Sequence, residues 1–121
     1  MKLTEINREF SVCKVNSIDQ VNLMHEYVFL SKTADEISLV CETEYIPSSA
    51  VAYECGWKAL KISGILDFSM IGVIAKISNI LVNEDISIFV VSTYNTDYIF
   101  FKAENHEKAC RALVHNGYVI V

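Results

Sequence analysis

Two groups of polar residues in the second half of the chain have types and spacing suited to holding a charged small molecule. Ser69 and Gly72 lie at the expected start of an amphipathic helix, where four backbone N–H groups lack partners and the helix dipole is positive. Such a helix start attracts a carboxylate or a phosphate. Thr93, Thr96 and Asp97 follow in a polar turn between two very apolar strands. Together these groups suit a zwitterion, which points to amino-acid binding rather than catalysis.

The cysteines and histidines show no spacing typical of a metal site or a catalytic centre. No C-x-x-C pair is present, and His106 with Cys110, one helical turn apart, is a weak pair for zinc. Nucleotide-binding loops, nucleophile elbows and zincin motifs are also absent from the sequence. We therefore expect no catalytic residue, no metal and no cofactor, and reduced, mostly buried thiols. The four cysteines are Cys13, Cys41, Cys55 and Cys110.

The composition fits one compact domain, or two small subdomains that share a core, and it argues against several classes of partner. The chain has 121 residues, of which 52% are hydrophobic and 21% charged, enough for a buried core. A net charge of −5 argues against nucleic acid. No apolar run approaches the roughly 20 residues of a membrane span. The first ten residues lack the apolar core of a signal peptide, so we expect a cytoplasmic protein with no membrane association.

A regular order of helices and strands positions the polar groups. The helix expected over 69–82 has apolar residues in the i, i+3, i+4, i+7 pattern. Gly117 predicts the end of a second helix that begins at an Asn105 cap. Ser17 opens a capping box, which predicts a short helix over 18–25. Strands are expected over 9–15, 27–32, 36–42, 57–63, 86–92, 97–103 and 118–121, with a polar connection over 43–49.

The order of elements predicts an α+β fold. The second half reads βαββαβ, a ferredoxin-like unit with helices on one face of an antiparallel sheet. The first half reads βαββ, the same unit cut short. The two halves show a weak internal sequence similarity. It aligns the segment from Ser31 with the segment from Thr93, so that Asp35 corresponds to Asp97. The matching element order favours duplication, although an Asp is common in any hairpin turn.

The second half of the chain resembles the ACT domain, a small-molecule regulatory module of amino-acid metabolism. The resemblance runs from the Gly56–Trp57 pair, through the DFS triplet and Gly72, to the STYNTDY turn. More narrowly, these motifs are similar to a compact bacterial group related to the eukaryotic cytosolic arginine sensors of the TOR pathway. The resemblance implies a shortened ACT-like subdomain over 1–55, an ACT domain over 56–121, no catalysis, and ligands held where ACT units meet.

The resemblance also implies a binding site. Backbone N–H groups at the helix start would hold an α-carboxylate, and Asp97 with two threonines would face an amino or guanidinium group, with apolar contact from two aromatic rings. An acidic turn residue favours a basic ligand such as arginine. Each residue also has a purely structural interpretation: Ser69 as an N-cap, Gly72 as a close-packing residue, Asp97 as a brace of its own turn. The candidate ligand-binding residues are Ser69, Met70, Ile71, Gly72, Phe89, Thr93, Tyr94, Thr96 and Asp97.

Two other functions stay open on the sequence alone. A ligand-free ACT-like module could dimerise a partner protein. A small enzyme could use Cys55 or Cys110 as a nucleophile with a nearby histidine, although neither has an obvious base beside it in the sequence. The primary interpretation is a non-catalytic regulatory or sensor protein that binds a small molecule, an amino acid.

Both faces of the hairpin formed by the strands at 86–92 and 97–103 are apolar. One face should be covered by helices and the other by a second layer or a second subunit, so we expect a homodimer. In the turn before this hairpin, Asn83 or Asp85 is expected to take a left-handed conformation. Alternation groups Ile86, Ile88, Val90, Tyr98 and Phe100 on one face, and Phe89, Val91, Ile99 and Phe101 on the other.

Overall fold

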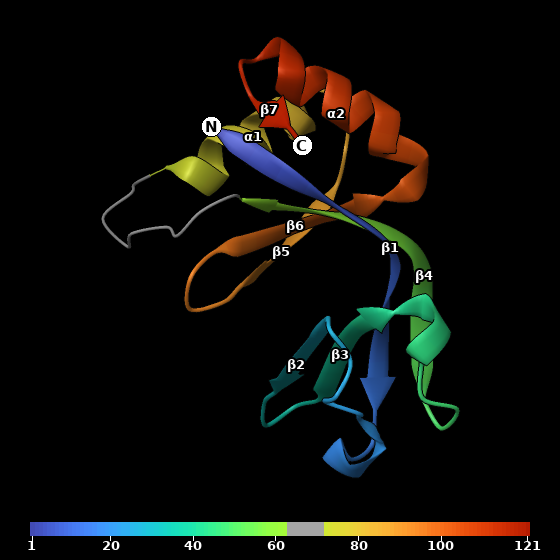
Figure 1. Cartoon of the computed structure of the whole chain (residues 1–121). Helices are drawn as coiled ribbons and strands as arrows, with labels where there is room; N and C mark the ends of the chain where they lie inside the picture. The colour runs from blue at the N-terminus through green and yellow to red at the C-terminus, as the bar shows by residue number, and fades with distance from the viewer. Residues whose placement is uncertain (63–71) are drawn as a thin grey trace. The chain divides into compact units, whose positions relative to one another are not determined.

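The computed structural model describes residues 1–62 and 72–121 and has the expected α+β architecture (Figure 1). In chain order the elements are β1 (Lys2–Val15), a 3-10 turn (Ile18–Gln20), β2 (Val28–Lys32), β3 (Ile37–Glu42), a 3-10 turn (Thr43–Tyr45), β4 (Ala52–Ile62), α1 (Val73–Val82), β5 (Ile88–Ser92), β6 (Asp97–Lys102), a 3-10 turn (Ala103–Asn105), α2 (His106–His115) and β7 (Val119–Ile120). The second half follows the predicted order βαββαβ, from β4 to β7.

The described chain divides into two compact units that are interleaved in sequence. The helical unit comprises Met1–Asn7 with Lys58–Val121, and the strand unit comprises Arg8–Trp57. The long strands β1 and β4 each contribute one end to each unit. The helical unit thus includes N-terminal residues that the expected ACT domain over 56–121 leaves out.

In the helical unit, both helices pack on the sheet and against each other. α1 buries Ile77 and Leu81, and α2 buries Ala109 and Leu113, each pair one helical turn apart. Full burial of one Ile or Leu side chain contributes about 1.5–3 kcal/mol, so this seam holds the helices in place. The predicted arrangement of helices on one face of the sheet is confirmed. The sheet supplies Leu3, Leu60, Ile62, Ile99 and Phe101 to the core.

The strand order of the helical unit departs from the expected antiparallel sheet at one edge. β6 pairs with β5 on one side and lies beside β4 on the other. The N-terminal end of β1 lies beside β4, and β7 pairs with β1 in parallel, with Lys2 opposite Val119. A strand from the start of the chain therefore separates β7 from β4.

The register of β5 and β6 corrects the expected grouping of their side chains. Val90 lies opposite Ile99, and Phe89 lies opposite Phe100. Directly opposite residues share a face, so the grouping of Tyr98 and Phe100 with Val90 is wrong, because a shift of one residue moves every side chain of a strand to the other face. The face toward the helices carries Ile88, Val90, Ile99 and Phe101, and the opposite face carries Phe89, Val91, Tyr98 and Phe100.

The hairpins of the two units repeat at an interval of 60 residues. Val28 pairs with Cys41 in the strand unit, and Ile88 pairs with Phe101 in the helical unit, so both partners advance by 60. A 3-10 turn follows each hairpin at the same interval. This agreement in register and in the following turn is what duplication of one ancestral unit would produce.

The two hairpin turns close in the same way, and this corrects their expected alignment. The N–H of Thr33 or Thr93 donates to the carbonyl oxygen three residues later, at 2.9 and 2.8 Å. Asp35 therefore corresponds to Asn95, and the expected match of Asp35 with Asp97 is wrong. Matching the two aspartates shifts the alignment of the hairpins by two positions. The hydrogen bonds of the turns give the correct alignment of one hairpin with the other.

The first helix predicted from the sequence is largely absent. A 3-10 turn covers Ile18–Gln20, and Val21 is already extended, with φ −98° and ψ 125°. Ser17 does cap this turn, because its Oγ accepts a hydrogen bond from the Asp19 N–H at 3.2 Å. The prediction of a helix over 18–25 is wrong. Ser17 acts as the predicted cap, but the turn buries no side chain. Without packing against the rest of the protein, a longer helix is not stabilised.

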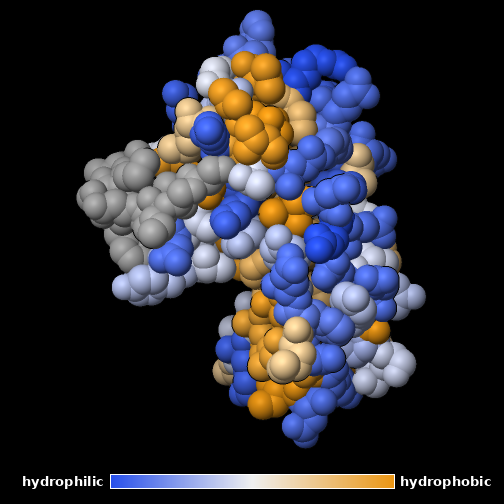
Figure 2. Space-filling view, in the orientation of Figure 1, coloured by the Kyte–Doolittle hydropathy of each residue, from blue (hydrophilic) through white to orange (hydrophobic). Residues whose placement is uncertain are grey.

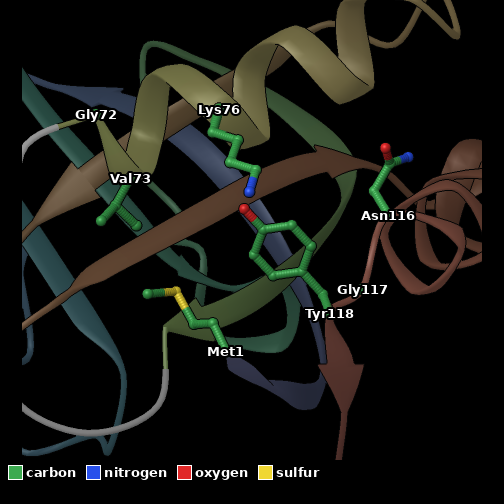
Figure 3. A pocket seen from close by; sticks show the side chains of 7 residues that line it. All are labelled: Met1, Gly72, Val73, Lys76, Asn116, Gly117 and Tyr118. Atoms are coloured by element: carbon green, nitrogen blue, oxygen red, sulfur yellow. The ribbon is translucent and has the colours of Figure 1, made fainter.

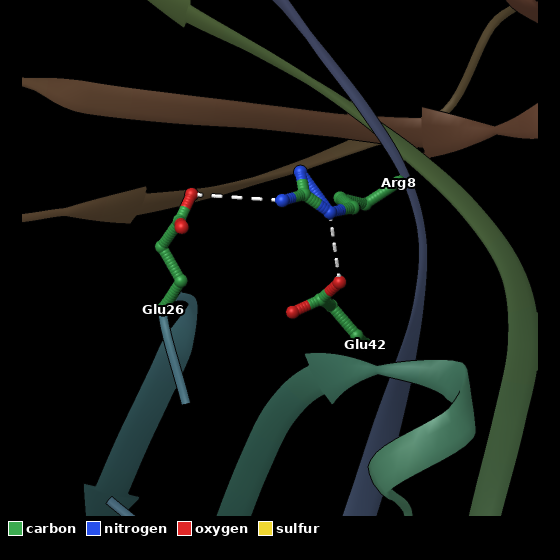
Figure 4. Close-up of polar contacts among 3 residues, drawn as sticks. All are labelled: Arg8, Glu26 and Glu42. Atoms are coloured by element: carbon green, nitrogen blue, oxygen red, sulfur yellow. Dashed lines mark ion pairs between the residues drawn. The ribbon is translucent and has the colours of Figure 1, made fainter. Parts of the chain in front are cut away.

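Arg8 on β1 neutralises a nearly buried carboxylate on β3 within the strand unit (Figure 4). Its Nε lies 3.0 Å from Oε1 of Glu42, whose side chain is 10% exposed, and its Nη2 lies 3.7 Å from Oε1 of Glu26. The guanidinium also lies over the Tyr27 ring, 5.5 Å from its centroid. An unpaired carboxylate at this depth would be strongly destabilising, so the contact fixes β1 against β3.

The turn after α1 takes the left-handed conformation expected there. Asp85 has φ +57°, and the Ile86 N–H donates back to the Leu81 carbonyl oxygen at 3.0 Å. The alternative, Asn83, has a right-handed helical conformation. The expectation is therefore confirmed for Asp85.

β7 forms an apolar edge on the surface of the helical unit. Figure 2 shows hydrophobic surface over β7 and the chain ends, where Met1, Val119 and Val121 are 48%, 51% and 60% exposed. Two backbone hydrogen bonds hold the strand. The Val119 N–H donates to the Met1 carbonyl oxygen at 3.0 Å, and the Val121 N–H donates to the Leu3 carbonyl oxygen at 2.9 Å.

Candidate functional site

The polar turn between β5 and β6 is held rigidly by its own threonines. The Thr93 hydroxyl donates to the Thr96 carbonyl oxygen at 3.0 Å and accepts from the Thr96 N–H at 3.4 Å. Tyr94 projects from the turn and is 87% exposed. Asp97 is half-buried and pairs with Ser92 across the hairpin. The turn therefore presents an accessible aromatic ring, and Asp97 follows as the first residue of β6.

Thr96 joins this turn to the end of β4. Its side chain is 5% exposed, and its hydroxyl donates to the carbonyl oxygen of Ile62 at 2.7 Å. Ile62 is the last residue of β4, the strand that precedes α1 in the chain. The structure thus brings the predicted turn next to the end of β4. The Thr96 hydroxyl already donates its hydrogen bond to the main chain there.

The start of α1 is formed by a glycine outside the helix rather than in its first turn. Gly72 has φ +80° and ψ 8°, and its carbonyl oxygen accepts the first helical hydrogen bond, from the Lys76 N–H at 2.9 Å. The expectation that the helix includes Gly72 is wrong, since the helix begins at Val73. A Cβ at position 72 would meet no atom within 4 Å, so backbone conformation and not close packing requires the glycine.

Four of the predicted site residues remain to be placed. Phe89 lies on the sheet, where its ring stacks on Phe100 with centroids 4.6 Å apart and planes at 2°. Ser69, Met70 and Ile71 lie outside the described residues. Among the described residues, the Thr96 bond brings the polar turn to the end of β4, and Gly72 lies at the start of α1.

A cavity of about 230 Å³ opens beside the first turn of α1 (Figure 3). One wall is Gly72, Val73 and Lys76, and the other is the turn that follows α2, Asn116–Tyr118, with Met1 at the side. Of these residues the sequence predicted only Gly72. A local signal was present, because a lysine near the positive end of a helix opposes the helix dipole. Nothing in the sequence connects that lysine with the turn after α2.

Cys110 has a histidine neighbour, but the geometry does not fit nucleophilic catalysis. Its Sγ lies 3.7 Å from Nε2 of His106, and the same nitrogen lies 2.5 Å from Oε1 of Glu5. A catalytic histidine uses one ring nitrogen for the nucleophile and the other for the carboxylate, whereas both groups meet one nitrogen here. Burial, and then the Glu5 carboxylate, raise the pKa of Cys110, and an activated cysteine needs a lowered pKa. The sequence pairs His106 with Cys110 one helical turn apart, and the structure places their side chains in contact.

Within residues 1–62 and 72–121, no group of three or more His, Cys, Asp or Glu could hold a metal ion. In the same residues, neither helix combines the length and apolarity needed to cross a membrane.

The fold is similar to that of several solved bacterial proteins. A protein of Agrobacterium tumefaciens is 25% identical, with a TM-score of 0.87 over 99% of this chain and 91% of that chain. A Vibrio cholerae protein of unknown function is 21% identical, with a TM-score of 0.75 over 92% of this chain and 85% of that chain. The regulatory subunit of aspartate kinase from Thermus thermophilus, in a ligand-free form, is 9% identical, with a TM-score of 0.66 over 93% of this chain and 95% of that chain. The last two similarities concern the fold alone.

The family comparison is more specific. A search of curated proteins finds no match. Residues 52–115 match the ACT domain family, and this range contains both Gly72 and the polar turn. Because the match covers more than half of the chain, the protein belongs to the ACT domain family.

Proposed function

We propose that this chain is a non-catalytic regulatory protein that binds a small molecule, specifically an amino acid. The observation that carries the proposal is the ACT domain match over residues 52–115, which includes the glycine at the helix start and the polar turn. The unfavourable geometry and raised pKa of Cys110 also speak against the rival enzyme. We place the protein in the cytoplasm as part of this proposal.

The proposed site joins the start of α1 with the turn between β5 and β6. Backbone N–H groups at Ser69–Gly72, which precede the first helical residue Val73, would hold the carboxylate near the positive end of the α1 dipole. Asp97 and Thr93 would face the amino or guanidinium group. The bond from Thr96 to Ile62 supports this pairing, because it fixes the turn beside the strand that leads to α1. Tyr94 and Phe89 would supply apolar contact.

The ligand class follows from the acidic turn. A half-buried carboxylate at Asp97 favours a cationic group, and arginine fits the resemblance to the arginine-sensor group. The alternative is a ligand-free module that dimerises a partner. Either function is compatible with a homodimer, which we propose as the assembly.

A thermal-shift screen over the twenty amino acids tests the proposal. Binding to the folded state alone adds about 2.7 kcal/mol of stability at a ligand concentration one hundred times Kd, which is easily measured. Calorimetric titration of the best ligand should then show that Asp97→Asn weakens binding by about 1.5–3 kcal/mol, or roughly tenfold to a hundredfold.

Asp35→Asn is the matched control, because Asp35 is an exposed acidic residue in the other hairpin turn. It should leave binding unchanged. A screen with no hit would favour the ligand-free module, and equal affinities for both variants would exclude Asp97 from the site.

A further inference from the structure

We propose that the cavity beside α1 binds the carboxylate of a small organic acid through Lys76 and Tyr118 (Figure 3). The proposal rests on the proposed function only in that Gly72 belongs to both. The whole cavity is built by the helical unit. None of the described residues that line it is acidic.

Lys76 is the cationic side chain of the cavity. It lies one turn inside α1, where the positive end of the helix dipole disfavours a cation. The ammonium forms no ion pair with any carboxylate in the described part of the chain. Asn116 and the turn after α2 contribute no ionised side chain to the cavity, and only the negative end of the α2 dipole lies on that side. An anion in the cavity would be attracted by both the ammonium and the helix start, and it would relieve their mutual repulsion.

Tyr118 provides the second, independent observation. The residue is 7% exposed, and Figure 3 shows its hydroxyl pointing into the cavity toward the Lys76 ammonium. Among the described residues, nothing forms a hydrogen bond with this hydroxyl. Burial raises the pKa of Tyr118, so the hydroxyl keeps its proton at neutral pH and can donate it to an oxyanion. Because the hydroxyl opens onto the cavity beside the ammonium, an oxyanion held there can accept its proton.

The remaining walls limit the ligand to a carboxylate with a short apolar tail. The Asn116 Nδ2, at 2.8 Å from the Ala112 carbonyl oxygen, and the backbone N–H groups of Asn116, Gly117 and Tyr118 all donate to the end of α2. Donors for an anion therefore come from Lys76, Tyr118, the first turn of α1 and the second N–H of the Asn116 amide. Met1 and Val73 add apolar side chains. At about 230 Å³ the cavity lies below the roughly 300–1,000 Å³ of drug-sized sites.

Two isosteric probes test the proposal on the full chain: 3-methylbutanoate and its neutral amide, 3-methylbutanamide. Each is titrated while the backbone amide signals are followed by two-dimensional 1H–15N NMR. We expect saturable shifts at Val73, Lys76 and Tyr118 with the acid, and affinity for the amide at least about tenfold weaker, since only the acid forms charge-assisted hydrogen bonds.

Variants separate the two contacts from general electrostatics. Lys76→Met and Tyr118→Phe should each weaken acid binding by about fivefold or more, whereas Lys108→Met should not. Lys108 is an exposed lysine on α2 that does not line the cavity, so it controls for the loss of one positive charge. Circular dichroism checks that each variant is folded.

The outcomes distinguish this proposal from the proposed function. Equal binding of acid and amide, or unchanged acid binding in folded Lys76→Met, overturns the carboxylate site. If Asp97→Asn abolishes amino-acid binding and Lys76→Met leaves acid binding unchanged, the proposed function stands and this inference fails. If the acid binds here and no amino acid binds the protein, the inference stands without the proposed function.

Discussion

At the scale of single residues, Thr96 shows how a side chain in a predicted site can serve the fold. Its hydroxyl, on a side chain that is 5% exposed, donates to the Ile62 carbonyl oxygen at 2.7 Å. This contact joins the polar turn to β4, beside which β6 also lies in the sheet. Thr93, by contrast, is exposed and bonds only within its own turn in the described structure.

Thr96→Val should lower the free energy of unfolding by about 1–3 kcal/mol, because it leaves a buried carbonyl oxygen without its donor. Thr96→Ser keeps the hydroxyl and should cost less. Urea denaturation measures both. A Thr96→Val protein as stable as the parent would mean that the bond to Ile62 contributes nothing, and the turn would need another anchor.

At the scale of elements, β1 and β3 bring together cysteines that are far apart in the sequence. Cys13 and Cys41 lie on these paired strands, and both are buried, at 2% and 3% exposure. Burial raises the pKa of Cys13, and burial followed by the neighbouring Cys13 raises the pKa of Cys41 to about 12. The folded strand unit thus holds two protonated thiols where the sequence shows only scattered cysteines.

These thiols predict a loss of stability in alkali. The ordinary thiol pKa is 9.0, so above pH 9 the unfolded chain loses a proton that folded Cys41 retains. The free energy of unfolding should therefore be unaffected below pH 9. It should fall as the pH rises from 9 towards 12, by at most about 1.4 kcal/mol per pH unit for this thiol.

Chemical denaturation at a series of pH values measures this slope. Cys41→Ala should flatten it, even though the smaller side chain lowers stability at pH 7. Parallel slopes for the parent and the variant would show that other groups cause the alkaline loss.

At the scale of the whole molecule, assembly depends on the apolar surface that the fold leaves exposed. Phe100, on the sheet face opposite the helices, is fully buried and Phe89 is half-buried. This leaves less apolar area on that face for a partner than the sequence suggests. The edge at β7 retains Met1, Val119 and Val121, about half exposed.

We predict a homodimer, because most soluble oligomers are symmetric dimers and apolar surface at β7 favours association. Analytical ultracentrifugation at micromolar concentration should give the mass of two chains of 13.7 kDa. Sedimentation of a single species at the monomer mass across the concentration range would rule the dimer out.

Local chemistry allowed much of the second half to be predicted from the sequence by itself. The apolar period of α1, the glycine after α2, the left-handed Asp85 and the polar turn each depend on residues within a few positions of one another. Side-chain periodicity and turn conformation are set by such neighbours. The βαββαβ order and the ACT resemblance followed, and the family match over 52–115 agrees with both.

Contacts between distant residues were decided only by the tertiary structure. The capped segment at Ile18–Gln20 stops after one turn because no packing extends it, and β1 lies between β7 and β4 because strand order depends on the whole sheet. Which side chains of β5 and β6 share a face depends on the pairing register of the two strands. The turn sets that register, and the alternation of apolar residues within each strand does not. Lys76 and Tyr118, 42 positions apart, meet at one cavity only because α1 and the end of α2 pack on the same sheet.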